Sequence, residues 1–172
     1  MRSEPDRRGN ATTIRLMSEV RFDDLDALNA LVSDELGPPG PGIAITQAMI
    51  DAFAELTDDK QWIHVDPARC AAESPFKVPI AHGFLVLSLV TALSRGGDNR
   101  ITGHGSVINY GADKLRFMSP VPAGSTVRAR RRIAHVRKKG VGGTQITFET
   151  EVWVDGADKP AMLYRSLALF LP

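Results

Sequence analysis

The amino-acid sequence predicts a single α+β domain in which a strongly curved antiparallel sheet encloses one apolar helix. Apolar residues recur at helical spacing in the first half of the chain, and they alternate with polar residues after Gly105. Between these halves lies the run Phe84-Leu-Val-Leu-Ser-Leu-Val-Thr-Ala-Leu93, which is apolar on every face of a helix. Such a helix is normally buried all round. A buried strand is the alternative for this run, but its length favours a helix.

The N-terminal part of the chain is expected to be an addition to the main domain. Residues 1–12 show no pattern and are interpreted as a loose tail. Over residues 22–36, apolar residues recur at helical spacing with acidic residues between them, which predicts a helix. The Gly/Pro run at 37–42 ends this helix and is interpreted as a linker. We therefore divide the chain into an N-terminal segment at 1–42 and a main domain at 43–172.

Two helices and a loop are expected at the start of the main domain. Thr46 can cap a helix over 46–56, in which apolar residues line one side. The stretch at 57–66 is polar and aperiodic, so we expect a loop there. A short helix is expected to begin at Asp66-Pro67, because aspartate caps a helix and proline is tolerated at its first position.

The remainder of the chain is expected to form antiparallel strands. Within 144–154, Ile146, Phe148, Thr150 and Val152 alternate with polar residues, as a strand with one buried face requires. Glycine, proline and aspartate mark the turns between the strands. The expected strands cover residues 106–110, 114–118, 126–136, 144–154 and 162–171.

Composition is typical of an ordinary soluble protein. The chain has 172 residues, 43% of them hydrophobic and 24% charged, which fits one globular domain. Its net charge of +1 provides no overall field to hold nucleic acid or an anionic membrane, so neither partner is expected. The single cysteine, Cys70, cannot form an internal disulfide. No apolar run of the kind found in secretory signals follows the N-terminus, and we expect a cytoplasmic protein.

Basic residues gather in one part of the chain. Residues 114–139 contain nine lysines and arginines and no acidic residue. One interpretation is the solvated face of a strand, and the other is a local site for a phosphorylated ligand. The cluster is too local to indicate DNA binding by itself.

Asp59, His64 and Gly83 form the candidate site. A carboxylate and an imidazole at this spacing can face one point if the loop turns between them, and together they can hold a water molecule. Both suit proton transfer near neutral pH, because histidine titrates near pH ~6.5 and the pKa of a carboxyl rises in a dry cleft. Gly83 would open the apolar helix, where an unpaired backbone amide stabilises negative charge. Taken alone, a loop with one aspartate and one histidine is also common on a solvated surface.

No cofactor site is expected from the sequence. The histidines His64, His82, His104 and His135 show no short paired spacing of the kind that metal ligands favour, so no metal site is predicted. The segment at 140–143 is rich in glycine, but it lacks the fingerprint of a phosphate-binding loop and lies between strands.

Two motifs resemble those of a known family. The first is Phe53-Ala-Glu-Leu-Thr-Asp-Asp-Lys-Gln-Trp-Ile-His-Val-Asp-Pro67, and the second is Pro79-Ile-Ala-His-Gly-Phe84. An aspartate, a histidine five residues later and a His-Gly pair that opens an apolar helix resemble the hydratase motif of MaoC-like (R)-specific enoyl-CoA hydratases. The Gln61-Trp-Ile-His64 variant and the later segment Ile108-Asn-Tyr-Gly111 resemble the NodN-like branch of that family. The resemblance covers about residues 43–171.

The resemblance implies a hotdog fold, in which a sheet wraps a central helix, and a homodimer. It implies reversible addition of water to a trans-2-enoyl-CoA, giving the (R)-3-hydroxyacyl-CoA, with no metal or redox cofactor. By position, Asp59 and His64 match the catalytic pair, and Gly83 matches the amide that binds the thioester oxygen. Thr91 lies near the position of a hydroxyl that supports the aspartate. Basic residues of 114–139 are candidates for binding the phosphates of the acyl-CoA substrate.

The sequence departs from the commoner Asp-x-Asn-Pro-Leu/Ile-His form of the motif. Gln61 replaces the asparagine and Trp62 replaces the proline. Gln61 can still offer an amide that orients the loop, whereas the bulkier Trp62 can reshape the acyl tunnel. Two alternative functions stay open, namely a hotdog acyl-CoA thioesterase and a non-catalytic module that binds acyl-CoA or an acyl-carrier protein.

Overall fold

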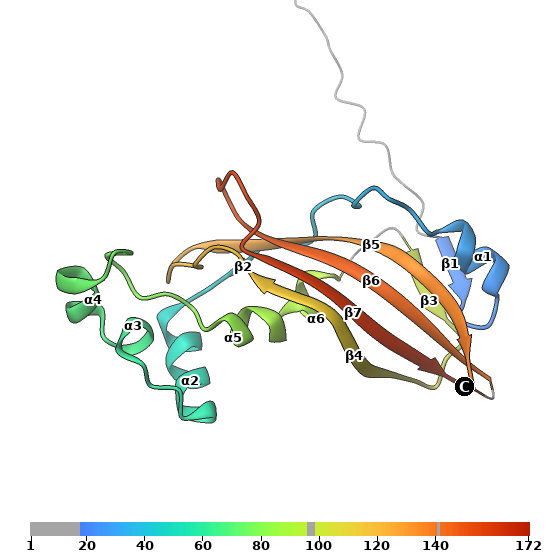
Figure 1. Cartoon of the computed structure of the whole chain (residues 1–172), viewed down its shortest axis with the longest axis horizontal. Coiled ribbons are helices and arrows are strands. Elements are labelled where there is room, and N and C mark those ends of the chain that lie inside the picture. Colours follow the sequence, from blue (N-terminus) through green and yellow to red (C-terminus); the bar gives the residue numbers. More distant parts are fainter. Residues whose placement is uncertain (1–17, 96–98, 141) are drawn as a thin grey trace, which may run out of the picture.

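A computed structural model describes residues 18–95, 99–140 and 142–172 of the chain. Its centre is a five-stranded sheet in the order β2-β5-β6-β7-β4, in which all neighbouring strands are antiparallel. The sheet curls over α5 and α6 (Figure 1), which confirms the expected architecture. The strands are β2 (Ile43–Ala44), β4 (Ser106–Phe117), β5 (Thr126–Lys139), β6 (Gly143–Val154) and β7 (Met162–Leu171).

The last three predicted strands agree with β5, β6 and β7. However, residues 143–148 of β6 are all buried, including Thr144, Gln145 and Thr147, so the polar side of this strand is not exposed there. The prediction of two separate strands at 106–110 and 114–118 is wrong, since these residues belong to the continuous strand β4. Tyr110 and Asp113 have no register partner on β7, because β4 bulges at both positions. A bulge breaks the two-residue period on which the sequence interpretation depended.

The apolar run forms two short helices, α5 (Gly83–Ser88) and α6 (Val90–Leu93), with Leu89 between them. Ser88 lies at this interruption, and its Oγ donates to the carbonyl oxygen of Phe84 at 2.8 Å. A hydroxyl that bonds back to the preceding turn commonly bends a helix.

The expectation that this run is buried all round is wrong for the single chain. Leu85, Val86 and Leu93 are buried against the sheet, whereas the Phe84 side chain is 63% exposed and Thr91 is also exposed. The curved sheet covers only one face of α5 and α6. The opposite face remains available for contact with another molecule.

The helices before α5 begin where their caps predict. The Thr46 hydroxyl accepts a hydrogen bond from the Met49 amide at 3.2 Å and starts α2 (Gln47–Thr57). The Asp66 carboxylate accepts one from the Arg69 amide at 2.9 Å and starts α4 (Pro67–Glu73). The stretch at 57–66 is not all loop, because it contains the single turn α3 (Trp62–Val65). One turn is too short to show a helical period in the sequence.

The prediction of one helix over 22–36 is wrong. Asp24 caps α1 (Leu25–Ala30), which is preceded by β1 (Ser18–Arg21) in a parallel pair with β3 (Asn99–Thr102). Residues 33–40 then run along β5, where their backbone amides donate to carbonyl oxygens of that strand. Pairing with β5 competes with helix formation beyond residue 31. The tail predicted at 1–12 lies outside the described residues.

Two hydrophobic clusters make up the core. The first joins α2, α5 and α6 to β5, β6 and the start of β7, and the second joins α1 and β1 to the other half of the sheet. The N-terminal segment therefore packs on the same sheet as the central helices. Among the described residues, none of the helices is long and apolar enough to cross a membrane.

Candidate active site

Three segments meet at the N-terminal end of α5. Helix α2 ends at Asp58, whose left-handed backbone (φ 58°) turns the chain toward Asp59. The Ile80 amide donates to the Ile63 carbonyl oxygen at 3.0 Å, and this bond holds α3 beside the chain that enters α5. The two sequence motifs therefore form one site.

His64 is buried on α3 in a defined tautomer. Its Nδ1 lies 2.6 Å from the carbonyl oxygen of Ile80. Because a carbonyl oxygen can only accept, Nδ1 carries the proton and Nε2 of the neutral ring keeps its lone pair. Burial lowers the pKa of His64 below its usual range and outweighs the opposing effect of the Ile80 carbonyl. The neutral, acceptor form of His64 is thus favoured near neutral pH.

The sequence interpretation included His82 in the second motif but gave it no role in the site. This residue is 3% exposed, and its ring stacks on His64 with 3.8 Å between ring centroids. Its Nε2 lies 2.9 Å from the backbone carbonyl oxygen of Asp59, so Nε2 donates and fixes the position of the Asp59 loop. Its Nδ1 is buried without a partner among the described residues. The signal for this role is a histidine placed directly before the helix-opening glycine.

Asp59, His64 and His82 bring three proton acceptors together. A carboxylate oxygen and one ring nitrogen of each histidine lie within 4.8 Å of one another. Asp59 is exposed and both histidines are buried, so the site opens outward through the carboxylate. One water molecule can donate to two of these acceptors, which is the arrangement needed to activate it.

The same three residues have the composition of a metal-ligand set, which the sequence spacing did not indicate. The fold brings His64 and His82 together although they are far apart in the sequence. However, the two rings stack with an angle of 28° between their planes, so their in-plane lone pairs run side by side. That geometry suits hydrogen bonding to water better than convergence on one ion. The absence of a metal stays a prediction.

Gly83 is the first residue of α5, and no side chain caps this helix. First-turn amides of a helix lack partners within the helix, so the Gly83 amide can donate to a ligand. A Cβ at this position would lie 2.9 Å from the ring atoms Cδ1 and Cε1 of Phe117. Only glycine lets β4 approach the start of α5 so closely.

The two residues predicted to support the site are Gln61 and Thr91, and neither forms a hydrogen bond with the Asp59 carboxylate. Gln61 precedes α3 with an exposed side chain that makes no capping bond, while its backbone carbonyl oxygen accepts from the His64 amide at 2.9 Å. Thr91 is exposed on α6, and no hydrogen bond joins it to Asp59 in the part of the chain that the structure describes. Their supporting roles stay predictions.

The basic residues of 114–139 lie on both faces of the sheet. Arg128 pairs with Asp155 at 3.0 Å, and Arg132 pairs with Glu149, as expected for a solvated strand face. Arg131 points the other way, toward the core side of β5.

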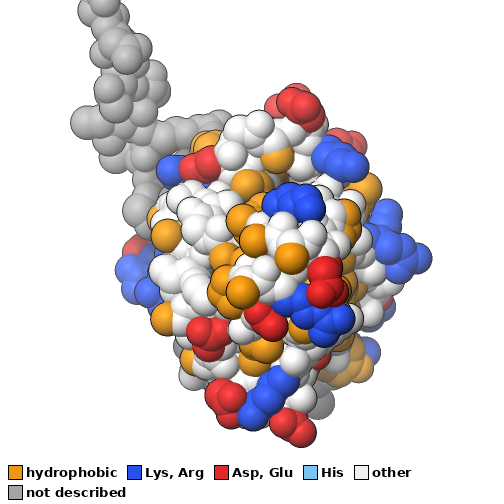
Figure 2. Space-filling view, turned by 90° about the vertical axis from the view of Figure 1, so that its left-hand side faces the viewer, with side chains coloured by type: hydrophobic (Ala, Val, Ile, Leu, Met, Phe, Trp, Pro, Cys, Tyr) orange, Lys and Arg blue, Asp and Glu red, His pale blue; other side chains and the backbone are white. Residues whose placement is uncertain are grey.

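At the end of the molecule formed by α2, α3 and α4, acidic and basic side chains are interspersed (Figure 2). That end therefore carries no patch of a single charge.

Comparison with known proteins agrees with this geometry. Residues 37–157 match the family model described as "MaoC like domain". The chain is 42% identical to Nodulation protein N of Rhizobium leguminosarum bv. viciae over 131 residues, covering 76% of this chain and 81% of that protein. It is 40% identical to 3-hydroxyacyl-thioester dehydratase Z of Mycobacterium tuberculosis over 150 residues, covering 87% of this chain and 97% of that protein.

A solved structure supports the same assignment. The (R)-hydratase from A. caviae involved in PHA biosynthesis superposes with a TM-score of 0.62 at 28% identity, covering 81% of this chain and 98% of that one. The curled sheet around α5 and α6 is thus the hotdog fold. Together with the family match and the nodulation-protein relative, this fold shows that the chain belongs to the MaoC-like domain family, in its NodN-like branch.

Proposed function

We propose that this protein catalyses the reversible addition of water to a trans-2-enoyl-CoA, giving the (R)-3-hydroxyacyl-CoA. The observation that carries the proposal is the cluster of the Asp59 carboxylate with His64, whose tautomer leaves Nε2 free to accept a proton. Relatives named as a 3-hydroxyacyl-thioester dehydratase and an (R)-specific enoyl-CoA hydratase support it, since dehydration and hydration are two directions of one reaction.

The proposed reaction uses one water molecule held between Asp59 and His64. His64 Nε2 accepts a proton from this water as its oxygen attacks C3 of the enoyl group. Asp59, in its protonated form, delivers a proton to C2 on the same face. The proton taken up by His64 then passes to Asp59, so that both groups return to their starting states. A positioned acid and base of this kind contribute about 10²–10⁴-fold each to a rate.

The Gly83 amide would complete the site. Attack at C3 moves negative charge onto the thioester oxygen, which becomes an enolate oxygen. A backbone donor aimed at that oxygen gains strength as the charge develops, and one such donor typically lowers a barrier by about 3–4 kcal/mol. The close approach of Phe117 to Gly83 fixes the start of the helix that carries this donor.

The direct test is hydration of crotonyl-CoA and of a longer trans-2-enoyl-CoA by the full chain. Loss of the conjugated absorbance reports turnover, and chiral analysis identifies the product. We expect the (R)-alcohol, at a rate unchanged by EDTA. Free thiol release from a saturated acyl-CoA would instead show a thioesterase, and stoichiometric binding without turnover would show a binding module. We separately propose that the protein lies in the cytoplasm, and the hydration assay does not bear on that proposal.

The pH profile of kcat/KM provides an independent check. His64 must be neutral to accept a proton, and burial lowers its pKa from 6.5. The acid limb of the profile, where His64 becomes protonated, should therefore lie below pH 6.5. The same shift makes the folded state relatively more stable above pH 6.5, a contribution that decreases as the pH falls toward the lowered pKa. An acid limb centred above pH 6.5 would contradict this assignment of His64.

Gly83→Ala is expected to reduce turnover by about 10-fold or more, because small displacements of a catalytic donor are costly. The added Cβ would lie 2.9 Å from the Phe117 ring, so either the ring or the start of α5 must move. The double variant Gly83→Ala/Phe117→Leu makes room for the methyl group and should recover part of the rate. Equal rates for the wild type and Gly83→Ala would show that this amide position is not critical.

A second copy of this chain is the proposed partner at β4. This edge strand of the sheet is 12 residues long and exposes large apolar side chains, and Phe84 extends the apolar surface onto α5. A long apolar edge strand invites pairing with another chain. The exposed apolar residues of β4 and its end are Val107, Ile108, Tyr110, Phe117 and Met118.

Ile108→Glu is expected to convert a dimer to a monomer. The side chain is 46% exposed in the single chain, so the charge should disturb the interface more than the fold. Light scattering coupled to size-exclusion chromatography measures the mass, and circular dichroism checks folding. Leu56→Glu is the matched control, since Leu56 is 82% exposed on α2. A monomeric wild-type protein would refute the proposed interface.

A further inference from the structure

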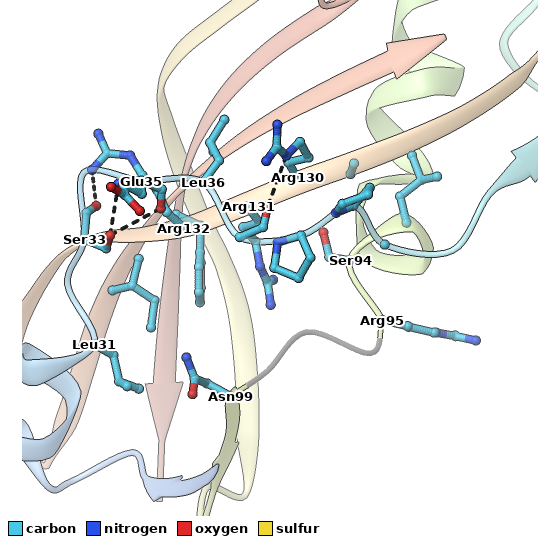
Figure 3. Close-up of a pocket in the computed structure, with 18 of the residues that line it drawn as sticks. Leu31, Ser33, Glu35, Leu36, Ser94, Arg95, Asn99, Arg130, Arg131 and Arg132 are labelled. Atoms are coloured by element: carbon cyan, nitrogen blue, oxygen red, sulfur yellow. Dashed lines mark hydrogen bonds between the residues drawn. The ribbon is translucent and has the colours of Figure 1, made fainter. Parts of the chain in front are cut away.

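A cavity separates the two hydrophobic clusters of the core. Its volume is about 740 Å³, and its walls come from the Gly/Pro segment, the end of α6, β3 and the middle of β5. Figure 3 shows this space with Arg131 directed into it between Ser94 and Asn99. Cavities of this size are in the range that small-molecule sites occupy.

Arg131 stands on the core-facing side of β5. It alternates with Ala129 and Ile133, which are both buried, whereas Arg130 and Arg132 face the other way. Its guanidinium carbon lies 4.4 Å from the centroid of the Phe148 ring. Among the described residues no carboxylate pairs with it, and burial lowers its pKa. Arg131 is half-buried, and a cation withdrawn from water without an anion is costly, so a negatively charged ligand would stabilise this position.

The neighbouring arginines contrast with Arg131. Arg130 donates to the Gly37 carbonyl oxygen at 3.1 Å, and Arg132 pairs with both Asp34 and Glu149. These contacts use the outer face of β5 and hold the Gly/Pro segment on that strand. Of these three arginines, only Arg131 has a side chain without a polar partner in the described part of the chain.

Two buried hydroxyl groups near Arg131 also lack partners among the described residues. Ser94 lines the cavity at the end of α6, and its Oγ makes no hydrogen bond. Thr150 lies directly opposite Arg131 on β6 and is 2% exposed, and its Oγ1 is likewise unpaired. An unsatisfied buried polar group costs about 1–3 kcal/mol. Of these two hydroxyl groups, that of Ser94 lines the cavity, so it is the one that can donate to a ligand beside Arg131.

The remaining walls combine apolar side chains with the polar residues Ser33, Glu35, Arg95 and Asn99. Leu31, Leu36, Leu93 and Ile133 line the space together with Phe148. The planar fork of one guanidinium matches a carboxylate, and one buried cation balances the single charge of that group. A phosphate monoester would bring a second charge. The other described cations of the walls are less suited to balance it, because Arg132 is already paired with carboxylates and Arg95 and Arg130 are exposed.

We propose that this cavity binds an unbranched carboxylate with an apolar chain, such as a medium-chain fatty acid. Arg131 binds the carboxylate, the Ser94 hydroxyl donates to it, and the aliphatic walls hold the chain. The cavity opens at the far end of the central helices from the Asp59 site. Gly83 and Ser94 are separated by roughly 16 Å along the helix axis. The site is therefore distinct from the proposed catalytic site.

The test is isothermal titration of the full chain with decanoate, with decanol as the uncharged probe. We expect saturable binding of decanoate and at least 10-fold weaker binding of decanol. Arg131→Met should weaken decanoate binding at least 10-fold, whereas Lys138→Met, at an exposed position of the same strand outside the cavity walls, should leave it unchanged. Asp59→Asn should also leave it unchanged, because binding does not use the catalytic site.

Ser94→Ala provides a second variant if Arg131→Met does not fold, and it should weaken decanoate binding several-fold. Loss of decanoate binding in Asp59→Asn would place the ligand in the catalytic site. Equal binding of decanoate and decanol would show that Arg131 does not recognise the carboxylate. Absence of decanoate binding to the wild type would leave only solvent in the cavity. Each of these results overturns the proposal without bearing on hydration activity.

Discussion

Asp59→Asn should reduce hydration of crotonyl-CoA by about 10²–10⁴-fold and leave the fold intact. The substitution keeps the size of the side chain but removes the group that can deliver a proton. The Asp59 side chain is exposed and makes no hydrogen bond with the described residues, while its backbone carbonyl oxygen accepts from His82. The bond that positions the loop is thus retained in the variant, and the loss should appear in kcat.

Asp58→Asn is the matched control for this experiment. Asp58 is the adjacent residue, it is also exposed, and its left-handed backbone is a conformation that asparagine tolerates well. Its variant should hydrate crotonyl-CoA at nearly the wild-type rate. If the Asp59→Asn variant is about as active as the Asp58→Asn variant, Asp59 takes no part in the proton transfer. That result would refute the proposed mechanism.

His82→Leu is the second change with a large expected effect, a loss of about 10²-fold in kcat/KM. The variant cannot donate to the Asp59 carbonyl oxygen, and it loses the imidazole that stacks on His64. Both catalytic groups would then be free to shift. Loss of one hydrogen bond should also lower the free energy of unfolding by about 1 kcal/mol.

His82→Gln separates positioning from a merely structural role. The glutamine side-chain amide can place a donor near the original Nε2 and restore the bond to the Asp59 carbonyl oxygen. We expect it to recover at least part of the activity that His82→Leu loses, although neither variant restores the stacked ring. His135→Gln, at an exposed position on β5, should behave as the wild type. Equal losses in both His82 variants would show that the bond to Asp59 is unimportant.

Local signals in the sequence were sufficient for much of the fold. The caps at Thr46 and Asp66 act through neighbouring backbone amides, so they can be recognised without tertiary structure. The alternation of apolar and polar residues likewise predicted β6, although both faces of its first half are buried. The motif containing Asp59 and His64 is short, and its residues lie close together in both sequence and space.

Other features depended on contacts between distant segments. The N-terminal segment forms only the short helix α1 because its later residues pair with β5, and β4 continues through two bulges because β7 lies beside it. The turn α3 and the chain before α5 are held together by the bond between Ile80 and Ile63. None of these partners is identifiable from local periodicity.

The sequence by itself determined the class of fold and the family, and it predicted the pair Asp59 and His64, because each is encoded by residue type and local spacing. Only the tertiary structure decided that His82 supports this pair and that Arg131 faces a cavity while Arg130 and Arg132 face outward. Register and packing decide whether two distant segments form a hydrogen bond. They also decide on which face of a strand a side chain lies. Both are properties of the folded sheet, and the arrangement of neighbouring residues along the chain does not specify them.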